Sequence, residues 1–577
     1  MTRRFCFAVS TLALLLGSPA LACEKHDPKN PAQSKPVQTE LKQFGHLPHA
    51  TPRPSPDSEV PLWDNLGSLS FKITTRNPMA QRYFDQGLML AFGFNHAEAR
   101  RSFQAAQRLD PACAMCHWGE ALVLGPNINA PMDPSSNEAA LRAQARAASL
   151  ASGASQREQA LVKALGARYS ADPAKERAAL DRAYADAMVA VAKRFPRDTE
   201  IATLAAEALM DLSPWDYWQA EGREPKGRTS EIVALLEGVL KANPDHPGAI
   251  HFYIHAVEAS DRPERAEGFA DRLAAQGLGA GHLVHMPSHI YYRVGRFRDS
   301  LAVNRRAAAA DEAFFQAVKP EGIYAGGYYP HNIHFLMVSA QMAGDGPTVI
   351  EAAEKLDRSV SDEAARAVPA FVQPIKAAPF FAHAQFSAPE AILALPKPGE
   401  GMPYVTAMWH YARGVAEAAR GDLAAARREA EAIATLGVEG DLSPLTGAGV
   451  PAADVLAIAR HVVLGRVAQA ERNWTGAVAA FEAAAALEGK LAYMEPPYWY
   501  YPVRQSLGAA HLQAGDVAAA EAAFRASLKS VPHNAWALYG LQEALARRGD
   551  TAERAEVARR FENAWAGERA ALSLPKL

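Results

Sequence analysis

Small and aromatic residues recur at fixed spacings along much of the chain. A glycine is followed by alanine 12 positions later, by phenylalanine 16 positions later and by a second small residue 19 positions later, and copies of this pattern begin at Gly87, Gly465 and Gly508. Two of these copies end in a proline 24 positions after the glycine. The pattern is typical of two antiparallel helices that touch at small residues, with an aromatic ring between them and proline ending the second helix.

Looser copies of the pattern occur in residues 288–311 and 409–434, and residues 140–211 are alanine-rich with a helical period and no strand pattern. The spacing resembles the tetratricopeptide repeat (TPR), a helix–turn–helix unit of about 34 residues. This resemblance implies an all-α fold, a right-handed α-solenoid of TPR-like helical hairpins. Such scaffolds serve many functions, so the resemblance does not name an activity. We expect divergent repeats over residues 77–380 and more regular C-terminal repeats over residues 381–577.

The first 22 residues have the features of a signal peptide. Arg3 and Arg4 precede an apolar run, residues 5–16, that is too short to span a bilayer, and residues 20–22 form an A-x-A cleavage site. The sequence therefore predicts an exported, periplasmic protein. A lipid anchor on Cys23, directly after the cleavage site, is the alternative to simple cleavage.

Composition narrows the class of protein further. Hydrophobic residues make up 49% of the chain and charged residues 21%, which suits a chain that buries a core. The net charge is −3, whereas a nucleic-acid-binding protein would show a basic stripe or a high isoelectric point. No run after the signal peptide is long and apolar enough to predict a transmembrane segment. Residues 23–76 are rich in proline and polar residues, which predicts a flexible lead-in.

Seven of the eighteen histidines fall between residues 248 and 334. When the repeats are numbered from their turns, three neighbouring units place these histidines and one glutamate on the helix face that lines the concave groove of TPR proteins. The eight candidate metal ligands are His251, His255, Glu258, His282, His285, His289, His331 and His334. Pro287 interrupts one of the helices, so we expect a helix beginning near Met286, with His282 and His285 in the loop before it.

Clustered imidazoles predict metal ligation, because neutral imidazole is a common ligand of copper, zinc and iron. Seven histidines exceed the ligand set of one ion, which implies a second ion or residues that orient the ligands. The sequence thus predicts an exported TPR-like protein that binds copper, zinc or iron in its groove. Redox chemistry and metal-assisted hydrolysis both stay open. The alternatives are an acid–base site without metal and a metal-free scaffold that binds a peptide or protein partner in the groove.

Cys113, Cys116 and His117 form a C-x-x-C-H motif. This motif is typical of c-type haem attachment, with thioether bonds to both cysteines and His117 as the iron ligand. The same residues, however, open the first helix of a repeat, and a regular repeat lacks an apolar haem pocket. The sequence therefore favours a disulfide or dithiol at Cys113 and Cys116, with haem attachment, free thiols and soft-metal ligation as alternatives.

A turn-rich loop and three aromatic clusters remain. The loop covers residues 125–131, and the clusters cover residues 215–218, 326–329 and 496–502. Each is predicted either to edge the groove, where aromatic rings stack on a ligand, or to pack between helices.

Overall fold

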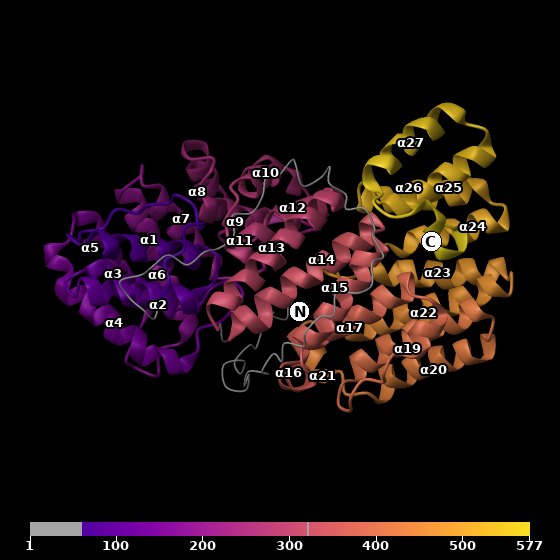
Figure 1. Ribbon diagram of the computed structural model, residues 1–577, viewed down its shortest axis with the longest axis horizontal. Coiled ribbons are helices and arrows are strands. Elements are labelled where there is room, and N and C mark those ends of the chain that lie inside the picture. Colours follow the sequence, from indigo (N-terminus) through magenta and orange to yellow (C-terminus); the bar gives the residue numbers. More distant parts are fainter. Residues whose placement is uncertain (1–59, 320–321) are drawn as a thin grey trace, which may run out of the picture. The chain divides into compact units, whose positions relative to one another are not determined.

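The computed structural model describes residues 60–319 and 322–577, and nearly all regular structure in these residues is helical (Figure 1). The predicted signal peptide and Cys23, the site of the alternative lipid anchor, lie outside these residues. The described chain divides into two compact units. The N-terminal unit contains residues 60–290 and the described part of 306–329, and the C-terminal unit contains residues 291–305 and 330–577.

Among the described residues, thirteen α-helices precede residue 320, and residues 291–305 of the last two belong to the C-terminal unit. They are α1 (Pro78–Phe92), α2 (His96–Leu109), α3 (Ala114–Val123), α4 (Asn137–Leu150), α5 (Gln156–Leu165), α6 (Arg177–Arg194), α7 (Thr199–Met210), α8 (Thr229–Ala242), α9 (Pro247–Val257), α10 (Glu267–Ala275), α11 (Gly281–His285), α12 (Pro287–Arg293) and α13 (Phe297–Ala317). A π-helix, η5, spans Tyr324–Tyr328. The described strands are a short antiparallel pair, β1 (Trp218–Gln219) and β2 (Glu224–Pro225).

The remaining α-helices build the C-terminal unit. They are α14 (Tyr329–Ala343), α15 (Gly346–Ser359), α16 (Asp362–Ala367), α17 (Pro369–Phe386), α18 (Pro389–Leu393), α19 (Pro403–Arg420), α20 (Leu423–Glu439), α21 (Ser443–Gly447), α22 (Ala452–Ala470), α23 (Trp474–Glu488), α24 (Val503–Ala514), α25 (Val517–Ser530), α26 (Ala535–Arg548) and α27 (Thr551–Ala564). Short 3₁₀ turns are η1 (Pro134–Ser136), η2 (Ala151–Gly153), η3 (Gly166–Arg168), η4 (Pro263–Ala266), η6 (Arg569–Ala571) and η7 (Leu574–Lys576).

The glycine–phenylalanine spacing in the sequence marks close contacts between helices. The Phe103 ring of α2 lies against Gly87 of α1 and Gly119 of α3, where a Cβ atom would come within 2.7 Å and 2.5 Å of the ring. In the C-terminal unit, the Phe524 ring packs in the same way against Gly508 and Gly540. Only glycine lets the helix backbones approach the ring this closely, so the sequence pattern reports the packing of the hairpins.

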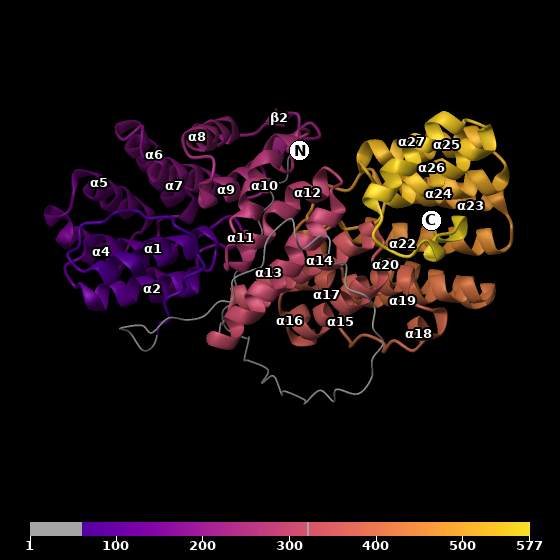
Figure 2. The same ribbon diagram turned by 45° about the horizontal axis from the view of Figure 1, so that its top comes forward.

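Consecutive helices pack as pairs. In the C-terminal unit, α19 packs on α20, α22 on α23, α24 on α25, and α26 on α27, and the pairs lie side by side (Figures 1 and 2). Several second helices begin at a capping side chain, such as Asn95 before α2 and Asp516 before α25, which accepts a hydrogen bond from a backbone N–H of the first turn. The fold is therefore an all-α solenoid of TPR-like helical hairpins, as predicted.

Residues 60–76 pack against the first helix. The Tyr83 hydroxyl donates to the Val60 carbonyl at 2.8 Å, the Gln86 side chain accepts from the Trp63 amide at 2.9 Å, and Trp63 and Phe71 are buried. This segment differs from the flexible lead-in expected over residues 23–76, because its apolar side chains complete the core around α1. Residues 23–59 lie outside the described part of the chain.

Across the described residues, no helix combines the length and apolar character that crossing a membrane requires.

Candidate metal centre

Six of the eight predicted ligands lie in the N-terminal unit, five of them on three short helices and Glu258 directly after the first of these. His246 caps α9 by accepting from the Ala249 amide at 3.1 Å, and α9 then carries His251 and His255 one turn apart. Helix α11 carries His282 and His285. The chain does break at Pro287, which begins α12, but His282 and His285 lie on their own five-residue helix rather than in the expected loop.

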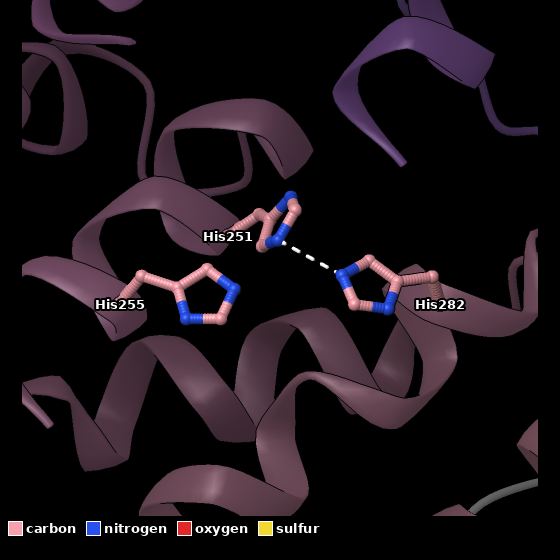
Figure 3. A group of neighbouring side chains, drawn as sticks. All are labelled: His251, His255 and His282. Carbon is pink, nitrogen blue, oxygen red and sulfur yellow. Dashed lines mark hydrogen bonds between the residues drawn. The ribbon is translucent and has the colours of Figure 1, made fainter. Parts of the chain in front are cut away.

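Three imidazoles converge on one space. His251, His255 and His282, here called the histidine trio, are 0%, 2% and 1% exposed, and their ligand nitrogens all lie within 4.8 Å of one another (Figure 3). The Nε2 atoms of His251 and His282 are 3.3 Å apart. Two ligands of a tetrahedral zinc ion, each with a bond of about 2.0 Å, lie roughly 3.3 Å apart. The His251–His282 pair therefore has the spacing of two ligands of one ion, and the third nitrogen lies within 4.8 Å of both.

Hydrogen bonds fix the orientation of two rings in the trio. His251 Nδ1 lies 2.6 Å from the Phe92 carbonyl oxygen, and His255 Nδ1 lies 2.7 Å from Glu258 Oε1. A carbonyl and a carboxylate only accept, so each Nδ1 carries the proton and each Nε2 carries a lone pair. His255 Nε2 is buried without a hydrogen-bond partner among the described residues. Burial lowers the pKa of both imidazoles, which keeps them neutral and able to bind a metal.

Glu258 joins the histidine trio to a second pair of imidazoles. Its other oxygen, Oε2, lies 2.7 Å from His289 Nδ1, and its side chain is completely buried. Burial alone would raise the pKa of Glu258, but the imidazoles of His289 and His255 outweigh burial and hold that pKa below its usual range. Both oxygens accept from N–H donors, a geometry in which a carboxylate orients histidine ligands.

The hydrogen-bond chain continues beyond Glu258. His289 donates through Nδ1, so its Nε2 accepts from His285 Nε2 at 2.7 Å. The Nδ1 atom of His285 then carries a lone pair and accepts from the Ser288 hydroxyl at 3.2 Å. In this assignment, each O–H or N–H group along the chain from Ser288 to Glu258 donates to one acceptor. Hydrogen bonding thus satisfies the facing Nε2 atoms of His285 and His289. The Nε2 atom of His255 has no such partner among the described residues.

The other two predicted ligands lie in the C-terminal unit. His334 Nε2 lies 3.0 Å from the Tyr500 hydroxyl, and burial lowers the pKa of His334 to about 3. His331 Nε2 lies 3.4 Å from a carboxylate oxygen of Glu495. Both histidines therefore have polar partners inside their own unit.

Aromatic rings surround the histidine trio. The Phe94 ring centroid lies 4.5 Å from that of His251, the Trp215 centroid 5.0 Å from that of His255, and the Tyr328 centroid 4.7 Å from that of His282. Phe94 and Trp215 have φ values of +56° and +64°, a left-handed conformation that is costly for bulky residues and concentrates at functional sites.

The sequence identified only part of this aromatic shell. Trp215 and Tyr328 belong to the clusters noted in the sequence, which the structure places beside the trio. The sequence analysis missed Phe94, because Phe94 lies in the turn between α1 and α2 and the repeat pattern predicts no role for residues in that turn. The signal that would have found it is the Gly93-Phe94-Asn95 turn itself, in which an apolar ring stands between two typical turn residues.

The loop at residues 125–131 edges the same site. Asn129 Oδ1 accepts from Trp215 Nε1 at 3.0 Å, and the side chains of Asn129 and Asn127 act on the Tyr328 hydroxyl, partly opposing the rise in its pKa that burial causes. The buried guanidinium of Arg168 fixes this arrangement from behind. Its Nη2 donates to the Pro126 carbonyl at 2.8 Å and to Asp211 Oδ2 at 2.6 Å, which ties the loop to the segment leading to Trp215.

Cys113 and Cys116 form a disulfide at the start of α3, and both are buried. Haem attachment uses the same two sulfur atoms for thioether bonds, so the disulfide and a c-type haem are mutually exclusive states of this motif. The adjacent His117 is half-buried, and burial lowers the pKa of its imidazole while the Pro111 carbonyl opposes that shift.

No family model matches the chain, and no curated protein matches it. Several solved helical structures are similar to it at low identity. A Naa15/Naa10 structure bound to HypK-THB has 14% identity over 84% of this chain and 70% of that chain, with a TM-score of 0.21. A human IFIT1 dimer with PPP-AAAA has 10% identity over 84% and 91%, with a TM-score of 0.31, and yeast Tom70 has 10% identity over 85% and 93%, with a TM-score of 0.26. Similarity this low carries no argument about function.

Proposed function

We propose that this exported TPR-like protein binds a transition metal ion, copper, zinc or iron, through the Nε2 atoms of His251, His255 and His282. One observation carries the proposal: three buried imidazole nitrogens lie within 4.8 Å of one another, and the Nε2 atom of His255 has no hydrogen-bond partner among the described residues.

The free-energy cost of a buried nitrogen without a hydrogen bond supports metal binding at the trio. A buried acceptor without a donor costs about 1–3 kcal/mol. His251 and His255 both direct lone pairs into the trio, because their Nδ1 protons are held by Phe92 and Glu258. In the metal-free protein the cost falls on His255 Nε2, since His251 Nε2 lies 3.3 Å from His282 Nε2. A bound cation satisfies the lone pair of His255, so this cost becomes part of the affinity for the ion.

Glu258 has the role of an orienting residue in this proposal. A carboxylate that accepts from the Nδ1–H of a ligating histidine fixes the ring and makes Nε2 a better donor to the metal. His289 and His285 extend the same hydrogen-bond chain. A site with three histidine ligands leaves a further coordination position, as catalytic zinc sites do, so the geometry is compatible with either metal storage or catalysis.

Metal binding to purified, tag-free protein tests the proposal. The protein is stripped with a chelator, dialysed against zinc or copper, and its metal content is measured by mass spectrometry. We expect at least one tightly bound ion per chain, and the loss of that ion in His255→Ala and His282→Ala. The control is His511→Ala, which changes a half-buried histidine on α24 and should keep the full metal content.

Circular dichroism of each metal-free variant checks that it is folded. Wild-type metal content in folded His255→Ala and His282→Ala would contradict the proposed site, and so would a wild-type protein that takes up no copper, zinc or iron.

A further inference from the structure

We infer that the histidine trio selects monovalent copper, Cu(I), over divalent ions, an inference that rests on the proposed metal function. It follows from the charge that surrounds the trio, the apolar rings that enclose it, and the number of donors that it provides.

The charge of the candidate ligand groups favours a single positive charge. The three ligands are neutral imidazoles. Among the described residues, Glu258 is the one carboxylate that belongs to any of the candidate metal-ligating groups of the chain. Both of its oxygens accept from imidazole N–H groups at 2.7 Å, so the carboxylate is ionised and provides one negative charge. A monovalent cation in the trio makes the group neutral by itself, whereas a divalent ion leaves one positive charge that needs an added anion, such as hydroxide, to compensate it.

The surroundings make an uncompensated charge costly. Glu258 is completely buried, the members of the trio are at most 2% exposed, and Phe94 is 2% exposed. The cost of moving a charge out of water rises with the square of that charge, so a net charge in this interior is strongly disfavoured. The Phe94 ring centroid lies within 6.3 Å of the centroids of all three imidazoles, which places an apolar side chain against every ligand.

The donor set supports the same ion. Zn²⁺ in a site with three histidines completes its tetrahedron with water or hydroxide, and Cu(II) prefers a planar arrangement of four donors. Cu(I) is a soft cation with a filled d shell and accepts two or three donors without an additional anion. Imidazole also suits zinc and divalent copper, so the preference for Cu(I) comes from the three-coordinate site and from the rings of Phe94, Trp215 and Tyr328 that line it.

The experiment compares Cu(I) with Zn²⁺ on the full chain carrying Cys6→Ser and Cys23→Ser, so that no thiol outside the Cys113–Cys116 disulfide binds copper. Copper is supplied anaerobically with ascorbate, and the dissociation constant is measured by competition with a chromophoric Cu(I) chelator. A tenfold excess of Zn²⁺ is then added, the sample is exposed to air, and electron paramagnetic resonance detects any Cu(II). The same measurements are made on His255→Ala and on the His511→Ala control.

The expected result is one equivalent of Cu(I) that Zn²⁺ does not displace and that stays silent in the resonance spectrum in air. Binding should weaken at least tenfold in His255→Ala and stay unchanged in His511→Ala. Displacement by Zn²⁺, or oxidation to Cu(II) with nitrogen hyperfine structure from His255, overturns the inference while the proposed metal function survives. If neither ion binds, and the metal-content measurement finds no iron either, the metal function is overturned as well.

Discussion

The Glu258→Gln substitution tests how the site is oriented. Glutamine has nearly the same shape as glutamate, but it provides one accepting oxygen and one donating amide where the carboxylate accepts twice. In the protein, both oxygens of Glu258 accept imidazole protons at 2.7 Å. One of the two imidazoles, His255 or His289, must therefore lose its hydrogen bond or move its proton to Nε2.

Both outcomes damage the site. If His255 moves its proton to Nε2, that proton points into the trio and blocks the metal ligand. If His289 does so, its Nε2–H faces the Nε2–H of His285 at 2.7 Å. A hydrogen bond to a charged group is worth about 1.5–3 kcal/mol, so we expect the free energy of unfolding to fall by about that amount. Metal affinity should fall about 10- to 100-fold, as it does when other orienting partners of metal ligands are changed.

Urea unfolding of the metal-free protein and titration calorimetry with the metal measure these two effects. The matched control is Glu237→Gln on α8. Glu237 is 43% exposed and accepts from Tyr253 and Arg265, so its loss should cost less than about 1 kcal/mol and leave metal affinity unchanged. Equal metal affinity in Glu258→Gln and the wild type would refute the orienting role of Glu258.

Three further predictions concern the fold. Burial lowers the pKa of His334 from 6.5 to about 3, so its contribution to stability is present above pH 6.5 and is lost as the pH falls towards 3. Between these pH values, the free energy of unfolding of His334→Phe should change less steeply with pH than that of the wild type, by up to about 1.4 kcal/mol per pH unit. An unchanged slope would contradict the shift. Arg168→Met should cost about 3–5 kcal/mol in denaturant unfolding, because it removes the guanidinium that faces the buried carboxyl groups of Asp211 and Glu207, and Arg168→Met/Asp211→Leu should recover part of that loss. Gly508→Ala should lower the melting temperature, because its Cβ would lie 2.7 Å from an aromatic ring at a cost of about 1–3 kcal/mol. The control Gly437→Ala places its Cβ 3.9 Å from its nearest neighbour and should be neutral or stabilising. Equal effects of the two substitutions would argue against the hairpin contact.

The fold was largely readable from the sequence because its contacts are local and periodic. Gly87 and Phe103 are 16 residues apart, and their contact recurs in each regular repeat, so spacing alone reports it. The packed segment at residues 60–76 was not readable. Its composition is that of a linker, and Trp63 and Phe71 are buried only because α1 offers partners that no periodicity reveals.

The site was readable only in part. Helical spacing correctly placed His251 and His255 on one face of α9, and it pointed to the break at Pro287. It did not show that His282 lies on a separate five-residue helix, because such a helix is stabilised by tertiary contacts rather than by its own sequence.

The division of roles among the histidines also needed the structure. Orienting groups differ from candidate ligands in their hydrogen bonds, namely those to the two oxygens of Glu258 and the one between His285 and His289. These contacts join residues up to 31 positions apart, so spacing along the chain does not reveal them.

His251, His255 and His282 are proposed to hold one ion. Anomalous diffraction from crystals of copper-loaded or zinc-loaded protein, recorded at the absorption edge of the metal, tests this proposal directly. We expect an anomalous peak about 2.0–2.1 Å from the Nε2 atoms of all three residues. A protein that takes up no metal in the crystal, or a peak bound elsewhere while the trio holds none, would contradict it.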